Sequence, residues 1–118
     1  MTDRRRRARD VPWVGDPTPI QEAPMLYLVI AKDGTDPEAP ARRQQVREAH
    51  LVGARKLAEA GTMHLGGALL DDAGAMIGSA IILEADDEAA ARALLEADIY
   101  HRGGVWRSYE IYPFRRAV

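Results

Sequence analysis

The sequence predicts one α+β domain of the ferredoxin-like type over residues 25–118, with a four-stranded antiparallel sheet and two helices on one of its faces. Two observations carry this prediction. The apolar segments follow one another in the order β-α-β-β-α-β, and clusters of glycine, proline and aspartate separate them. The 118 residues leave no room for a second ordinary domain.

The first half of the predicted domain is a strand followed by a long helix. Residues 25–31 form an apolar run of strand length, and the Gly, Asp and Pro content of residues 32–37 predicts a loop. A helix then starts near Pro40 and ends at Gly61, residue types favoured at these two ends. Its expected core-facing stripe, at helical spacing, consists of Val46, Ala49, Gly53, Leu57 and Ala60.

The second half contains three strands and another helix. Residues 62–70 and 75–83 are predicted strands, joined by a hairpin turn at residues 71–74. Asp86 or Asp87 is expected to cap the second helix. After Gly103-Gly104, residues 105–114 form the last predicted strand. The inward-facing side chains of this helix are expected to be those of Ala90, Ala91, Leu94 and Leu95.

The strands at residues 25–31 and 75–83 are apolar on both sides, which is typical of strands buried on both faces. Two helices can cover only one face of the sheet. A second copy of the chain is therefore expected to cover the other face, giving a homodimer as a sheet-on-sheet pair or a barrel.

The composition excludes several classes of protein. The chain has no cysteine, which removes disulfide and thiolate chemistry and fits a cytoplasmic location. No apolar run reaches the length of a membrane span. The net charge of −2 argues against a general nucleic-acid binder. Residues 1–24, rich in arginine and proline, are predicted to form a disordered, solvated arm, with contact to nucleic acid as the open alternative.

The common motifs for cofactors and nucleophiles are missing from the sequence. It contains no P-loop, no G-x-S-x-G, no H-E-x-x-H and no G-x-G-x-x-G after a strand. His50, His64 and His101 lack metal-ligand spacing. We therefore expect neither a metal nor a cofactor.

His50 and Asp98 are out of place by the logic of burial. His50 lies four residues after Val46 on the packed stripe of the first helix, and Asp98 lies at the C-terminal end of the second helix, four residues after Leu94. The two helices lie side by side in this fold, so a His50–Asp98 hydrogen bond would satisfy both groups. The other ring nitrogen would then be free to act as a general acid or base. The alternative is a satisfied core histidine and a solvated carboxylate.

Four short motifs resemble those of the YciI-like (YCII-related) family, in the same order and elements. They are Arg47-Glu48-Ala49-His50-Leu51, Gly67-Ala68, Asp98-Ile99-Tyr100 and Ile111-Tyr112-Pro113-Phe114. The resemblance covers essentially all of residues 25–118 and implies a dimeric α/β barrel without a cofactor, in which His50 and Asp98 are the catalytic pair. One branch of this family eliminates chloride from chlorinated hydroxyquinols. Ala68 and Ile99 stand where the family often has proline.

Two neighbours of the pair are predicted to bind a substrate. Arg47, one turn before His50 and matching a family arginine, is expected to contact an anionic or phenolate group. Tyr100 is expected to offer its hydroxyl. The alternatives are a surface ion pair for Arg47 and a packing role for Tyr100.

These residues together predict a small cofactor-independent enzyme that uses a His-Asp dyad. The expected reaction is an elimination, isomerisation or hydrolysis of a small cyclic or aromatic metabolite. A non-catalytic module that binds a small ligand is the main alternative.

Overall fold

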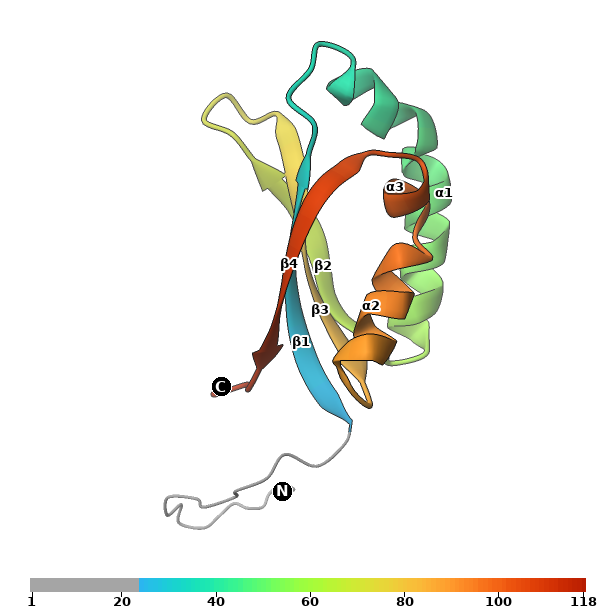
Figure 1. Ribbon diagram of the computed structural model, residues 1–118, viewed down its shortest axis with the longest axis vertical. Coiled ribbons are helices and arrows are strands. Elements are labelled where there is room, and N and C mark those ends of the chain that lie inside the picture. The colour runs from blue at the N-terminus through green and yellow to red at the C-terminus, as the bar shows by residue number, and fades with distance from the viewer. Residues whose placement is uncertain (1–23) are drawn as a thin grey trace.

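The computed structural model describes residues 24–118, so the arm predicted for residues 1–24 lies outside the described residues apart from Pro24 (Figure 1). The strands are β1 (Met25–Asp33), β2 (Met63–Leu70), β3 (Met76–Ala85) and β4 (Trp106–Phe114). The helices are α1 (Ala39–Glu59), α2 (Glu88–Glu96) and α3 (Ile99–Arg102). None of these helices is both long and apolar enough to cross a membrane.

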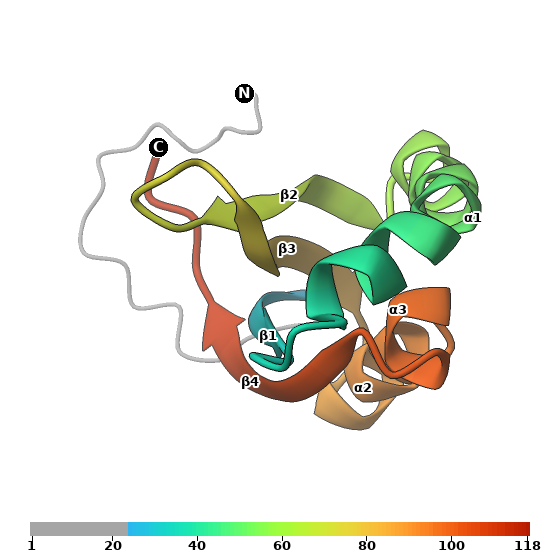
Figure 2. The ribbon, with the colours of Figure 1, turned by 90° about the horizontal axis from the view of Figure 1, so that it is seen from above.

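The four strands form one antiparallel sheet in the order β2-β3-β1-β4. All three helices lie on the same side of this sheet, and no other described element covers the opposite side (Figures 1 and 2). The predicted α+β ferredoxin-like fold is therefore confirmed. The central strands β1 and β3 contribute four of the nine buried residues of the main core cluster, and the core lies between these strands and the helices.

Strand alternation divides the side chains of the sheet into two sets. Val29 of β1 pairs with Ile81 of β3, and both are buried beneath the helices. Their neighbours Leu28 and Ile82, which also pair with each other, point to the opposite side and are only half-buried. The sheet therefore has a packed face toward the helices and an apolar face without a partner among the described residues.

The packed stripe of α1 differs from the prediction. Val46 and Leu57 pack against the core as expected, but Ala49, Gly53 and Ala60 are exposed. Small side chains bury little apolar area, so the helix instead turns its longer side chains inward. The observed stripe runs through Arg43, Val46, His50, Ala54 and Leu57. It includes two polar residues because each finds a partner beneath the helix.

The second predicted helix is broken into α2 and α3. Asp87 caps α2 by accepting a hydrogen bond from the Ala90 N–H, and the helix ends at Glu96, with Ala97 as its C-cap. Asp98 then has an extended backbone, φ −70° and ψ 142°, and its carboxylate accepts a hydrogen bond from the Tyr100 N–H. Asp98 thus begins a new helix rather than ending the previous one. The predicted place of Asp98 at the C-terminal end of the second helix is therefore wrong, and its carboxylate lies instead at a helix N-terminus, where a negative charge is favourable.

Candidate functional site

The structure brings His50 and Asp98 together across the contact of α1 with α3. The His50 Nδ1 atom lies 2.8 Å from Asp98 Oδ1 and 3.1 Å from Oδ2. The two side chains are 13% and 12% exposed, so solvent screens their interaction only weakly. The Nε2 atom of His50 has no hydrogen-bond partner among the described residues and is free to exchange a proton.

The position of Asp98 is set by the short helix that it caps. Its Oδ1 atom accepts hydrogen bonds both from His50 Nδ1 and from the Tyr100 backbone N–H, the latter at 2.8 Å. Ile99 occupies the first helical position, where a missing N–H costs nothing and proline is favoured. The departure from Asp-Pro-Tyr at this position therefore leaves the cap intact.

The Tyr100 ring orients the imidazole of His50. The two rings are stacked with centroids 3.8 Å apart and planes within 6° of parallel. Tyr100 is fully buried, and its hydroxyl has no hydrogen-bond partner within residues 24–118. Burial raises the pKa of Tyr100 above its usual value, although the Arg43 and Arg47 guanidiniums act in the opposite direction. The hydroxyl therefore stays protonated near neutral pH.

A buried ion pair, absent from the sequence prediction, lies beside the stacked rings. Arg43 Nη1 donates to both carboxylate oxygens of Asp33, at 3.0 and 2.9 Å, and Arg43 Nη2 donates to Ser79 Oγ at 3.2 Å. Trp106 Nε1 donates to the same Ser79 oxygen at 3.1 Å. Arg43 Cζ also lies 4.7 Å from the centroid of the Tyr100 ring, within range of a cation–π contact. These contacts link α1, the central strands and α3 into one polar cluster.

Asp33 was expected in the loop 32–37, but it is the last residue of β1. The strand parity carries the signal that was missed, because Asp33 continues the inward series of Val29 and Ala31. Arg43 could be found by spacing, since it lies seven residues before His50 on the same helical face. Because a buried charge is costly unless it is paired, the negative charge of Asp33 and the positive charge of Arg43 have to meet.

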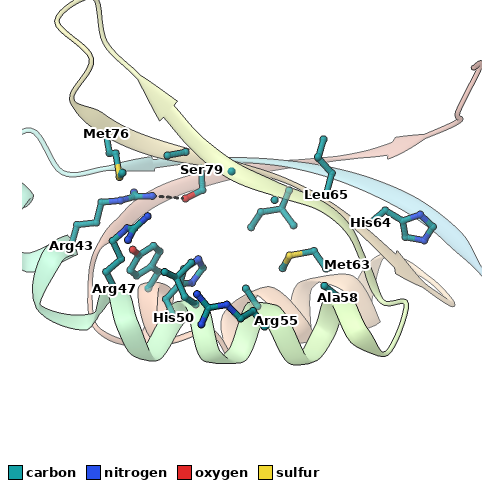
Figure 3. Close-up of a pocket in the computed structure, with 17 residues that line it drawn as sticks. Arg43, Arg47, His50, Arg55, Ala58, Met63, His64, Leu65, Met76 and Ser79 are labelled. Atoms are coloured by element: carbon teal, nitrogen blue, oxygen red, sulfur yellow. Dashed lines mark hydrogen bonds between the residues drawn. The ribbon is translucent and has the colours of Figure 1, made fainter.

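A cavity of about 410 Å³ separates the middle of α1 from strands β2 and β3 (Figure 3). This volume lies within the roughly 300–1,000 Å³ that is usual for small-molecule sites. Its polar end is formed by Arg43, Arg47, His50, Ser79 and Tyr100. Its remaining wall is largely apolar and includes Leu51, Ala54, Ala58, Met63 and Ile81.

The other predicted candidates occupy different places around this cavity. Arg47 lines it, half-buried, and makes no ion pair with a residue of the described range. His64 lies at its rim, where Nε2 is 2.7 Å from Glu84 Oε1, whereas His101 packs edge-on against Tyr109. Within residues 24–118, no three His, Asp or Glu side chains are grouped closely enough to hold a metal ion.

The sequence and the fold have counterparts among known proteins. The sequence model of the YCII-related domain matches residues 25–115. A chlorohydroxyhydroquinone dehydrochlorinase (TftG) from Burkholderia phenoliruptrix AC1100, solved in complex with 2,5-dihydroxybenzoquinone, is 25% identical. The match covers 79% of this chain and 96% of that one, with a TM-score of 0.67.

A second solved structure supports the fold alone. It is PA3566 from Pseudomonas aeruginosa, which is 14% identical, with a TM-score of 0.50 and coverage of 83% of this chain and 99% of that one. A comparison with curated proteins gives no match.

Proposed function

Because this chain belongs to the YCII-related family, we propose that it is a small cofactor-independent enzyme in which His50 and Asp98 transfer protons on a small cyclic or aromatic metabolite. One observation carries the proposal. The imidazole is bound through Nδ1 to a carboxylate that does not line the cavity, while the same ring forms part of the cavity wall. Its Nε2 edge is therefore the one available to a substrate.

Asp98 prepares His50 for proton transfer in two ways. Its carboxylate accepts the Nδ1–H, which leaves Nε2 as the basic nitrogen of the neutral ring. It also stabilises the imidazolium that forms when Nε2 takes a proton from a substrate hydroxyl or carbon acid. Stacking on Tyr100 keeps the ring plane in place during this step. The proton on Nε2 can then pass to the product or to a leaving group.

The polar end of the cavity suits the negative charge left on a substrate when its proton is removed. Arg47 and Ser79 line this end, and the Arg43 guanidinium is held rigidly by Asp33. Donors fixed before the reaction stabilise a developing oxyanion without reorganising, which is a large term in many enzymes. The cluster therefore supports an elimination or isomerisation through an enolate or phenolate.

The first reaction to test is elimination from a hydroxylated ring. The 25% identical relative is a dehydrochlorinase, and its structure was solved in complex with a dihydroxybenzoquinone. The apolar wall of the cavity fits such a ring, since Leu51, Ala54 and Met63 offer no hydrogen-bonding side chain. A ring bound there would present its hydroxyl to His50 and its oxyanion to the arginine end.

The test is untargeted mass spectrometry of a small-metabolite pool incubated with the wild type, with His50→Ala, with Asp98→Asn and with the control His101→Ala. We expect a mass feature whose rate of change falls by about 10²–10⁴-fold in the first two variants, a range typical of general acid–base groups. His101 does not line the cavity, so its removal should leave the rate unchanged.

Equal conversion by folded His50→Ala would contradict the proposed role of the dyad. A metabolite that binds to both proteins and is never converted would instead favour the non-catalytic ligand-binding module. Thermal unfolding of each variant, monitored by circular dichroism, separates a lost proton transfer from a lost fold.

Tyr100→Phe distinguishes a substrate contact from simple packing. A buried hydroxyl without a partner is destabilising, so its removal should raise the free energy of unfolding by about 1 kcal/mol. If Tyr100 donates to the substrate, the same variant should bind 2,5-dihydroxybenzoquinone several-fold more weakly in isothermal titration. Tyr109→Phe is the control, because the Tyr109 hydroxyl already has hydrogen-bond partners in Arg92 and Glu96 and does not line the cavity, so its removal should not increase stability. Unchanged binding would leave Tyr100 with a packing role.

The proposal extends to the assembly, because the face of the sheet away from the helices carries an apolar surface. Leu28 and Ile82 lie at its centre, Tyr112 beside them is 47% exposed, and Leu65 on the edge strand is 62% exposed. A contiguous apolar surface of this kind favours a second copy of the chain as its partner.

A further inference from the structure

The charge of the cavity wall restricts the class of substrate beyond the proposed reaction. Three arginines, Arg43, Arg47 and Arg55, line the cavity together with two histidines. No aspartate or glutamate is among the 17 residues that form the wall. A wall with this composition concentrates anions, because like-signed side chains around a partly enclosed space add their potentials.

Only one of the three guanidiniums is neutralised. Arg43 is held by the buried carboxylate of Asp33 behind the wall. Arg47 forms no ion pair with any residue in the range 24–118. The Arg55 guanidinium has one ionic neighbour there, Glu48, at 4.0 Å, and the two side chains are 63% and 82% exposed. A pair this long and this exposed contributes little, so Arg55 remains available to a ligand.

Arg55 stands apart from the oxyanion end of the cavity. It lies two helical turns after Arg47 on α1, a rise of about 12 Å between their Cα atoms. Leu51 and Ala54 form the apolar wall between them. Figure 3 shows the Arg55 side chain extending along α1 toward His50, as expected from the tilt of helical side chains toward the N-terminus. The Arg55 guanidinium and the His50 imidazole therefore border the same cavity from neighbouring turns of α1.

From this arrangement we infer that the substrate is a cyclic carboxylic acid. Arg55 would bind its carboxylate, while its hydroxyl or keto oxygen would contact His50 and the polar end of the cavity at Arg43. The inference rests on the proposed function in taking this cavity as the substrate site. It adds a specificity-determining residue, Arg55, and a second charged group on the substrate. The apolar wall takes the ring that separates these two groups.

The test is isothermal titration with 4-hydroxybenzoate and 4-hydroxybenzamide, which carry a charged carboxylate and its uncharged carboxamide analogue on the same ring. We expect the wild type to bind the carboxylate up to about fivefold more tightly, the upper end for an exposed charge pair, and less so at high salt. Arg55→Gln should abolish this preference. Lys56→Gln removes the same charge from the next residue, which is exposed and outside the cavity, and should retain it.

Equal affinity of the wild type for the two compounds would overturn the inference, as would a preference that survives in Arg55→Gln or a failure of both compounds to bind. Because titration needs no turnover, its outcome is separate from that of the dyad experiment. A carboxylate preference that depends on Arg55 would support the inference even if no product forms. Conversion of an uncharged substrate by His50 would support the proposed function even if Arg55 makes no contribution to binding.

Discussion

Replacing Asp33 by alanine is expected to lower the free energy of unfolding by about 3–5 kcal/mol, since it leaves the guanidinium of Arg43 buried without a counter-charge. Both side chains are almost fully enclosed, 4% exposed for Asp33 and 7% for Arg43. Their two hydrogen bonds of 3.0 and 2.9 Å are lost together. Urea denaturation followed by circular dichroism measures the change.

Asp36→Ala is the matched control for this prediction. Asp36 also binds an arginine of α1, Arg42, but these side chains are 35% and 22% exposed, and we expect a loss of at most about 1 kcal/mol. Equal losses in the two variants would contradict the assignment of Asp33–Arg43 as a desolvated pair. A double variant, Asp33→Leu with Arg43→Met, should recover most of the stability because no charge is left buried. Such a variant would be folded but would lack the Arg43 donors at the polar end of the cavity.

Leu28→Glu is expected to convert a dimer into a monomer. Leu28 lies on the central strand β1, between Ile82 of β3 and Tyr112 of β4, on the sheet face that the helices do not cover. In a dimer a glutamate there would be desolvated without a partner, whereas in a monomer it remains in water. Sedimentation velocity at micromolar concentration should give the mass of two chains for the wild type and the mass of one chain for the variant.

Val52→Glu controls for the general effect of an added charge. Val52 is an exposed apolar residue of α1, 43% exposed, and lies on a helix rather than on the sheet. We expect this variant to sediment as the wild type does. A wild type that sediments as a monomer would remove the proposed dimer, and the open face of the sheet would then have to be explained by another partner.

The order of elements could be predicted from the sequence because it depends on local signals. Glycine and aspartate mark the ends of the strands and helices, and the apolar runs between them have the lengths of one strand or one helix. The rotation of α1 could not be predicted in the same way. Its small residues are compatible with several faces, and only packing against β2, α3 and the core beneath them selects the face through Val46 and Leu57.

The need of His50 and Asp98 for a polar partner could be predicted from the sequence, because their spacing from Val46 and Leu94 puts both among positions expected to be buried. The rest of the site depends on contacts between segments, which no local pattern encodes. Asp98 serves as the cap of a separate helix, and Arg43 finds Asp33 across a layer of packed side chains. Such contacts join residues far apart in the chain, and no periodicity within a single segment carries information about the neighbour that another segment supplies.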